Sequence, residues 1–453
     1  MKVKRKTRRQ RRKNNTKRVI RGGKVIDSGG YGCVFKPALK CKTIEPTKIT
    51  PSTSLSHKTV YVSKIMNKRD AEEEYNLLNR FATIITNSRK TSMFRFMVLS
   101  GITMCHVSPT QEDKEEFITQ CKRLAEKNGI TSISDMVSLN IPYAGKNLLK
   151  MFNELRFQNS VLNRGITIDY FKRMRSLFQG GVLPLYETTP KIIHGDIKEE
   201  NMLCQYNETM TSIYDEIKVI DWGLSFTYNE NNQQDRLEAV RQISRRPLQF
   251  NLPFGILLFS DYFYKRYNSD VLTPLRSNPH RLVELVRHFC DTYYDDNFFK
   301  NGKDDSKPDS LKDFNTFVYM IMGEADASIL RISLPSYIRI NLAKILIKYT
   351  RNGRFEKELY AYDYYLPIID TYGFILTYGN VLSYLLQSRR NTYRMTTATT
   401  NATTNINQLI VFITRQLKQY CLEFDETING DTYRKNVSQS IDKMTELCME
   451  MLK

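Results

Sequence analysis

The sequence predicts an α+β protein in which a small β-rich region comes before a larger, mainly helical one. Between residues 25 and 144, short apolar and β-branched runs alternate with glycine and proline, which is the pattern of strands joined by turns. From residue 145 onward, apolar residues recur at helical spacing. The chain has 453 residues, 41% of them hydrophobic, which is enough to bury one large core or two moderate ones.

The β-rich region is expected to contain a hairpin, a helix and further strands. "KVIDSGGYGCVFKP" (24–37) has two β-rich runs joined by glycines and ended by proline, as in a hairpin. Residues 58–66 alternate like a strand, and residues 93–108 are expected to form one or two more. Between them, residues 67–85 place four apolar side chains near one face of a helix: Ala71, Tyr75, Leu78 and Phe81.

The helical region is expected to contain two amphipathic helices at 148–157 and 167–178 and a strongly apolar helix at 370–387. A polar and aromatic stretch at about 255–365 has no pattern that assigns it a role. "TTATTNATTNIN" (396–407) is predicted to be a low-complexity linker, because Thr and Asn favour turns over helix.

Positive charge is concentrated at the N-terminus. The formal net charge is +20, and residues 1–24 carry thirteen Lys and Arg, with no acidic residue before Asp27. Because such a block repels itself, we expect a disordered basic arm over residues 1–24. Three roles fit this arm: a solvated tail, a nuclear-import signal, or a contact with nucleic acid or another polyanion.

Hydropathy and cysteine spacing bear on where the protein is found. The sequence has no run of about 18 apolar residues, so no membrane span is expected, and no apolar secretion segment follows the basic N-terminus. The eight cysteines include no Cys-x-x-Cys and no zinc-site spacing. We therefore expect a soluble intracellular protein with free thiols in a reducing compartment.

Two features of the β-rich region suit phosphate binding. Gly29, Gly30 and Gly32 in "SGGYGCVF" let the backbone approach phosphates closely, although such clusters also make ordinary tight turns. Lys64 is the one charge in the strand "VYVSKIM" and is expected to contact phosphates, held by Glu74 from the next helix. Glu72 and Glu73 are alternative partners, and a solvent-facing lysine is the alternative role. No Gly-x4-Gly-Lys-Ser/Thr occurs in the sequence, which excludes a P-loop, and the strand expected after the glycines disfavours a Rossmann turn.

The strongest signal is "HGDIKEEN" (194–201) followed by "KVIDWGLSF" (218–226). Asp196 can accept or orient the proton of an attacking hydroxyl, and Lys198 can place a cation on a transferring phosphoryl group. Asn201 and Asp221 offer hard oxygen atoms, the ligands that Mg²⁺ prefers. The intervening "QYNETMTSIYDE" is expected to form an extended hairpin.

In the order of these motifs the chain resembles a eukaryotic-type protein kinase, of the divergent form encoded by large DNA viruses such as poxviruses and giant viruses. The resemblance implies a bilobal fold, with an N-lobe at 25–144 and a C-lobe at 145–453 that carries the 255–365 stretch as an insertion. It also implies that ATP and Mg²⁺ are bound, and that a viral protein of this kind is found in the host cytoplasm, in the virion or, through the arm, in the nucleus.

The resemblance further implies roles for individual residues. Asp196 and Lys198 are then catalytic, and Asn201 and Asp221 ligate magnesium. Asp370 is expected to brace the backbone of the catalytic loop. The residues expected to contact the nucleotide are Ile26, Gly29, Gly30, Gly32, Val34, Lys64 and Glu74.

The implied activity is transfer of the γ-phosphate to Ser/Thr hydroxyls of protein substrates, since Lys198 favours Ser/Thr over Tyr. Small-molecule kinases of the aminoglycoside and choline type share "HGD", the asparagine and "IDW", and a pseudokinase or scaffold is the other alternative. Lys198, Gly223 after Trp222, and the glycine loop favour a protein kinase. Asp27 at the usual first glycine, Trp222 for phenylalanine, and the absence of Ala-Pro-Glu depart from the family pattern.

Gly195 stands where most protein kinases have an arginine that receives an activation-segment phosphate. Because glycine has no side chain, we expect activity without phosphorylation of that segment. The segment is expected to be held by packing of "PLQFNLPF", with Arg241, Arg245 and Arg246 able to compensate in part.

Overall fold

The computed structural model describes residues 23–29, 32–44, 60–129, 132–157, 162–246, 249–298, 338–395 and 401–452. The chain divides into two compact units. The small unit takes the residues up to Tyr75 together with Gly101–Tyr143, and the large unit takes Asn76–Ser100 and Ala144–Lys453. The predicted α+β class is confirmed, because the small unit is built on an antiparallel sheet and the large unit is mainly helical.

The small unit contains a six-stranded antiparallel sheet in the order β1-β2-β4-β6-β5-β3. The strands are β1 Lys24–Ser28, β2 Cys33–Lys36, β3 Cys41–Ile44, β4 Tyr61–Met66, β5 Thr103–Val107 and β6 Val137–Pro142. The helices α2 Gln111–Gln120 and α3 Lys122–Asn128 follow β5, and α1 Lys68–Asn87 begins in this unit and continues into the large one.

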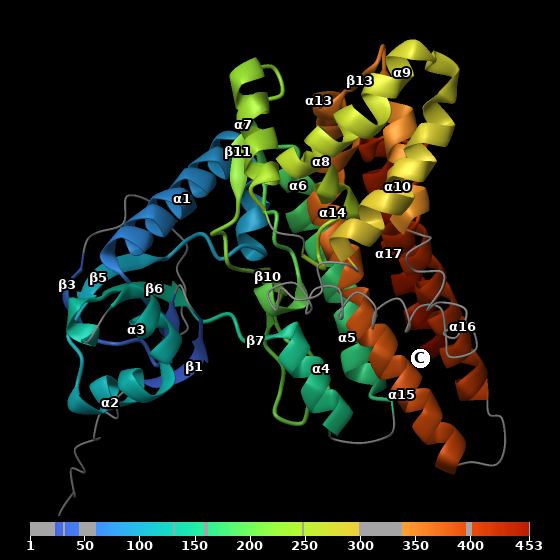
Figure 1. The fold of residues 1–453 in the computed structure, drawn as a ribbon. Coiled ribbons are helices and arrows are strands. Elements are labelled where there is room, and N and C mark those ends of the chain that lie inside the picture. The colour runs from blue at the N-terminus through green and yellow to red at the C-terminus, as the bar shows by residue number, and fades with distance from the viewer. Residues whose placement is uncertain are drawn as a thin grey trace, which may run out of the picture. The chain divides into compact units, whose positions relative to one another are not determined.

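The hairpin, the strand and the helix expected at the start of the chain are all present (Figure 1). β1 and β2 pair around the glycine cluster, and the alternation of residues 33–36 buries Cys33 and Phe35 in the core. That core also takes Val107 from β5 and Phe117 from α2. Of the stretch 93–108 only β5 is a regular strand, since residues 91–95 form a short 3₁₀ turn.

Four of the eight cysteines form disulfides in the small unit, Cys33–Cys121 and Cys41–Cys105. The expectation of free thiols is therefore wrong for these four. The sequence separations are 88 and 64 residues, so cysteine spacing along the chain carried no sign of the pairing. The free cysteines, all buried in the large unit, are Cys204, Cys290, Cys421 and Cys448.

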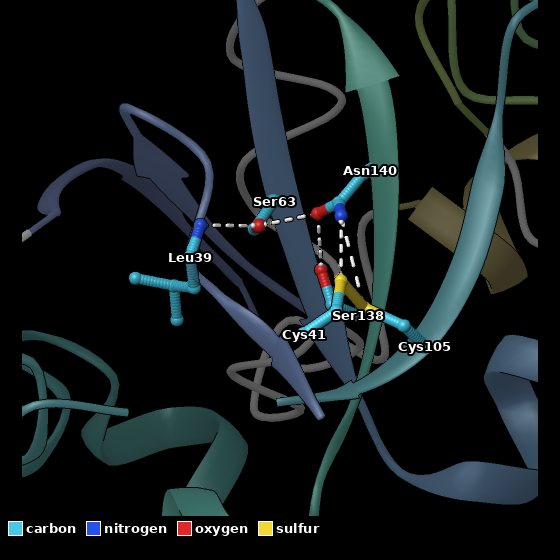
Figure 2. Close-up of a disulfide and its surroundings, with 6 residues drawn as sticks. All are labelled: Leu39, Cys41, Ser63, Cys105, Ser138 and Asn140. Atoms are coloured by element: carbon cyan, nitrogen blue, oxygen red, sulfur yellow. Dashed lines mark hydrogen bonds between the residues drawn. A yellow bond between two sulfur atoms is a disulfide. The ribbon is translucent and has the colours of Figure 1, made fainter. Parts of the chain in front are cut away.

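A polar network lies beside the Cys41–Cys105 disulfide (Figure 2). The Oδ1 atom of Asn140 accepts hydrogen bonds from Ser63 Oγ at 2.6 Å and Ser138 Oγ at 2.8 Å, while its Nδ2 donates to Cys41 Sγ at 3.1 Å. Both serines are fully buried, and each finds its partner in Asn140. A buried polar network that is satisfied in this way favours one strand register over its alternatives.

The large unit has short strands and long helices. Its strands are β7 Lys146–Asn147, β8 Lys191–Ile193, β9 Met202–Cys204, β10 Lys218–Val219, β11 Phe226–Tyr228, β12 Thr350–Arg351 and β13 Arg354–Phe355. Its helices up to the gap at 299–337 are α4 Leu148–Phe157, α5 Arg164–Leu177, α6 Leu183–Leu185, α7 Gln233–Ser244, α8 Asp261–Tyr267, α9 Thr273–Ser277 and α10 Leu282–Phe298. Those after the gap are α13 Lys357–Tyr360, α14 Leu366–Leu376, α15 Tyr378–Met395, α16 Asn401–Leu417 and α17 Gly430–Leu452.

Helix α14 is the centre of the large unit. Every residue of α14 is buried, and the helix packs against α15 and α17. α15, α16 and α17 run side by side (Figure 1). Gly373 of α14 lies where a Cβ would collide with the carbonyl oxygen of Ile197, so the glycine lets the helix approach the loop after β8. The apolar helix predicted at 370–387 is observed as parts of two helices, α14 and α15, with Thr377 between them.

The predicted linker at 396–407 is wrong for residues 401–407, which belong to α16. The Thr and Asn side chains favour turns, but Leu409, Ile413 and Leu417 are buried where α16 packs on α15 and α17. Tertiary packing thus overrides local propensity here. Residues 396–400 lie outside the described residues.

Two other expectations fall partly outside the described residues. Of the predicted basic arm, residues 1–22 are outside, whereas Gly23 is buried and donates its N–H to Asp113, and β1 begins at Lys24. Of the 255–365 stretch, residues 299–337 are outside. Its described parts are folded around an aromatic core that includes Phe263, Tyr267 and Phe289.

Within the described ranges, no helix is both long enough and apolar enough to cross a membrane.

Candidate active site

One carboxylate holds the backbone of the loop between β8 and β9 (194–201). Asp370 of α14 accepts hydrogen bonds from the backbone N–H of His194 at 2.8 Å and of Gly195 at 2.6 Å. Burial raises the pKa of Asp370, while the two backbone amides and the positive charge of Arg246 favour its ionised form. The bracing role expected for Asp370 is confirmed by these two bonds.

His194 is neutral and has a defined tautomer. Its Nδ1 accepts the N–H of Asp196 at 3.2 Å, so the proton is on Nε2, which lies 3.1 Å from the carbonyl oxygen of Ile220. The side chain is fully buried against the ring of Trp222, and burial lowers its pKa. His194 therefore joins the loop to Ile220, the residue that follows β10, and does not titrate as an exposed histidine would.

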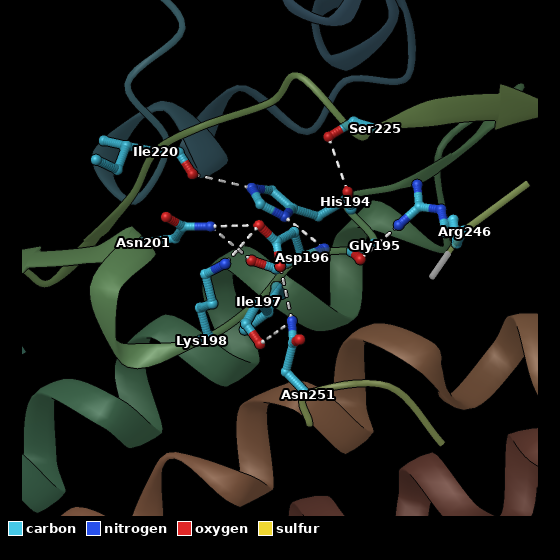
Figure 3. Close-up of polar contacts among 10 residues, drawn as sticks. All are labelled: His194, Gly195, Asp196, Ile197, Lys198, Asn201, Ile220, Ser225, Arg246 and Asn251. Carbon is cyan, nitrogen blue, oxygen red and sulfur yellow. Dashed lines mark hydrogen bonds and ion pairs between the residues drawn. The ribbon is translucent and has the colours of Figure 1, made fainter. Parts of the chain in front are cut away.

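The carboxylate of Asp196 is surrounded by donors (Figure 3). Oδ2 accepts from Asn201 Nδ2 at 2.9 Å and lies 3.0 Å from Lys198 Nζ, and Oδ1 accepts from Asn251 Nδ2 at 2.9 Å. Asp196 is only 4% exposed. Its orientation is therefore set on both oxygens, and Lys198 supplies the compensating charge.

The two residues expected to bind magnesium are brought together by strand register. β10 pairs with β9 through Val219 and Met202, and Ile220 N–H continues the ladder to Asn201 O at 2.9 Å. Asp221 follows at once, exposed, with a backbone φ of 65° that is uncommon outside glycine. Such conformations concentrate at functional sites.

The donor set of this pair fits magnesium. The Nδ2 of Asn201 donates to Asp196, which leaves its Oδ1 directed away from Asp196 (Figure 3). The described residues contain no group of three or more His, Cys, Asp or Glu gathered as for a metal. Mg²⁺ keeps several waters and commonly binds one or two protein oxygens together with phosphates, so one carboxylate and one amide are sufficient.

The small unit holds the other predicted residues. Lys64 Nζ donates to both oxygens of Glu74, at 2.8 and 2.7 Å, so the observed pair is the preferred one, whereas Glu72 and Glu73 pair with Lys68 and Arg69.

The glycine loop lies next to this pair. Gly29 N–H donates to Gly32 O at 2.9 Å, and a Cβ on Gly32 would lie 3.2 Å from Lys64 Cε. Ile26 is exposed and Val34 half-buried, while Gly30 is outside the described residues.

Two contacts on the loop 194–201 were missed from the sequence. Asn251 binds Asp196 Oδ1 and, at 3.3 Å, the carbonyl of Ile197, across separations of 55 and 54 residues. Arg246 binds Gly195 O at 2.6 Å across 51 residues. The available signal for Asn251 was that it is the one polar residue in the apolar run "FNLPF" (250–254). Nothing distinguished Arg246 from Arg241 and Arg245.

The sequence was also compared with models of protein families and with curated proteins, and neither comparison found a match.

Proposed function

We propose that this chain is a protein kinase that transfers the γ-phosphate of ATP to serine and threonine hydroxyls. The observation that carries the proposal is the set of contacts around Asp196. One buried loop presents an oriented carboxylate, a lysine 3.0 Å from it, and an asparagine whose amide oxygen is left for a metal. The small sheet unit and the large helical unit correspond in kind to the two lobes that the resemblance implies.

Asp196 is the group that receives or orients the proton of the attacking hydroxyl. Its two oxygens are held by Asn201 and Asn251, so its direction does not depend on the substrate. A carboxylate in this role contributes about 10²–10⁴-fold to a rate. Lys198 reaches the same place as a positive point charge and supports charge on a transferring phosphoryl group.

Asn201 and Asp221 would hold magnesium through the amide oxygen and the carboxylate. When bound, Mg²⁺ neutralises charge on the phosphates of ATP and helps to align them. In the small unit, Glu74 fixes the ammonium group of Lys64 on β4, and the Lys64 side chain stays partly exposed. This arrangement suits a contact with nucleotide phosphates. Gly29 and Gly32 suit the close approach of backbone to phosphate.

The test is phosphate transfer from radiolabelled ATP by purified wild-type protein, Asp196→Asn and Asp221→Asn. Wild type should label a basic protein on Ser or Thr. Asp196→Asn should lower the rate about 10²–10⁴-fold while ATP still binds, because only the nucleophile loses its partner. Asp221→Asn should instead weaken nucleotide binding in the presence of magnesium, because it removes a ligand charge.

The matched control is Asp261→Asn, an exposed carboxylate in the first turn of α8, which should leave the rate unchanged. Wild-type turnover in a clean Asp196→Asn preparation would remove Asp196 from its assigned role. Labelling of aminoglycosides or choline-like alcohols in place of protein would show a small-molecule kinase instead.

A further inference from the structure

Arg246 makes a contact with the catalytic loop that the proposed mechanism leaves unexplained. Its guanidinium donates through Nη1 to the carbonyl oxygen of Gly195 at 2.6 Å and through Nη2 to the carbonyl oxygen of Leu224 (Figure 3 shows the first of these). Its Cζ also lies 5.5 Å from the centre of the Phe226 ring. One side chain thus joins three segments: the catalytic loop, the stretch after Asp221, and the residues after α7.

The absence of a side chain at Gly195 is what makes room for this guanidinium. A Cβ built on Gly195 would lie 2.7 Å from Arg246 Nη2 and 2.8 Å from Cζ, closer than real Cβ contacts. Gly195 also has φ +72°, which other residues rarely adopt. Even alanine at this position would displace Arg246.

The surroundings suit a partly buried cation. Burial lowers the pKa of Arg246, but Asp370 and Asp196 favour its charged form, and arginine stays protonated in proteins. The planar fork can satisfy two carbonyl groups at once, which the single ammonium of lysine cannot do in the same geometry. The neighbouring Arg241 pairs with Glu238 and Arg245 is exposed, so Arg246 is the arginine of this stretch that contacts the loop.

We propose that Arg246 is a positioning residue that clamps the segment 224–246 to the catalytic loop, and that Gly195 is glycine to accommodate it. This rests on the proposed function. The guanidinium of Arg246 holds the carbonyl oxygen of Gly195, so the cation is part of the chain itself. The segment is therefore ordered without a phosphate. The positive charge is carried by the segment, on Arg246, and its partner is the carbonyl oxygen of Gly195 in the loop.

The experiment is chemical rescue of full-length Arg246→Ala with methylguanidinium. Loss of two charge-assisted hydrogen bonds should lower kcat on the order of ten- to a hundredfold. The KM for ATP should change little, because the described contacts of Arg246 are with Gly195, Leu224 and Phe226 and not with the residues assigned to ATP. Millimolar methylguanidinium should restore part of kcat, and methylammonium should not. Arg246→Lys should resemble Arg246→Ala, since charge alone does not span both carbonyls.

Gly195→Ala tests the space at the loop, and Gly353→Ala is its matched control. Gly353 has φ +70° and no atom within 4 Å of a built Cβ, so its variant carries the same backbone strain without a collision. Gly195→Ala should reduce kcat far more than Gly353→Ala. In Gly195→Ala/Arg246→Ala the two losses should not add, and methylguanidinium should not rescue, because the new Cβ fills its place.

Hydrogen exchange of peptides covering 190–201 and 224–251 gives a readout that does not depend on catalysis. Exchange should be faster in Arg246→Ala and slower again with methylguanidinium. If wild type transfers no phosphate but exchange responds in this way, the proposed function falls and the clamp stands. If Arg246→Ala is fully active with unchanged exchange, or if methylguanidinium restores neither readout, the clamp is overturned and the proposed function is untouched.

Discussion

At the scale of single residues, His194 shows how a residue within a sequence motif can serve structure instead of chemistry. Its Nδ1 and Nε2 are both used, by the N–H of Asp196 and the carbonyl of Ile220. It is fully buried, and burial holds its pKa below the usual 6.5. A proton on Nδ1 would break the bond to Asp196, so the fold requires the neutral ring.

We predict that this histidine makes stability depend on pH. The unfolded chain takes up a proton near pH 6.5, whereas folded His194 does so only at lower pH, so the free energy of unfolding should fall as pH drops below about 6.5. The contribution has a limiting slope of about 1.4 kcal/mol per pH unit. Asp370 contributes in the opposite sense. Because its pKa is raised in the folded protein, its contribution to the free energy of unfolding is lost as the pH rises through that pKa.

The measurement is the free energy of unfolding in urea between pH 5 and pH 7 for wild type and His194→Gln. Glutamine can keep the donor to Ile220 but does not titrate, so the difference between the two curves isolates the histidine. The curves should converge as the pH falls. Parallel curves would contradict a buried, neutral His194.

At the scale of elements, two disulfides cross-link the small unit. One disulfide ties β2 to the residue between α2 and α3, and the other ties β3 to β5, an edge strand to its neighbour. Both close loops of more than sixty residues, which is where cross-links restrict the unfolded chain most. We expect each bond to stabilise the small unit by about 2–5 kcal/mol.

This expectation can be checked by counting thiols. Protein purified without reductant and then denatured should be alkylated at four cysteines, and at all eight after reduction. Reductant should also speed hydrogen exchange in peptides of the small unit more than in peptides of the large unit, because both bonds lie in the small unit. Eight reactive thiols in the unreduced protein would refute the two bonds.

Element types were predictable where one periodicity ran unbroken. The hairpin of β1 and β2, the helices α1, α4 and α5, and the hairpin around the bridge between Tyr206 and Ile213 all follow from local pattern. Residues 401–407 were mispredicted, because their Thr and Asn residues favour turns and most of the buried residues that hold α16 in place lie further along the chain. The disulfides were missed because paired cysteines meet only through the fold.

At the scale of the whole molecule, the site residues divide in the same way. Asp196, Lys198 and Asn201 lie within six residues of one another, and Asp221 follows after the strands β9 and β10, so their spacing is visible in the sequence. Asn251 and Arg246 reach the same loop from more than fifty residues away, and the insertion between them and Asp370 hides any regular spacing. The two units each contribute one part of the predicted set, the Lys64–Glu74 pair in one and the Asp196 loop in the other.

The central claim is that this chain phosphorylates protein hydroxyls with an activation segment already held in place. It is tested most directly by the time course of phosphate transfer from ATP by protein shown by intact mass to be unphosphorylated. We expect Ser/Thr labelling that is linear from the first time point, at a rate that phosphatase pretreatment leaves unchanged. A lag that disappears after preincubation with ATP and returns after phosphatase treatment, or labelling no greater than that of Asp196→Asn, would contradict it.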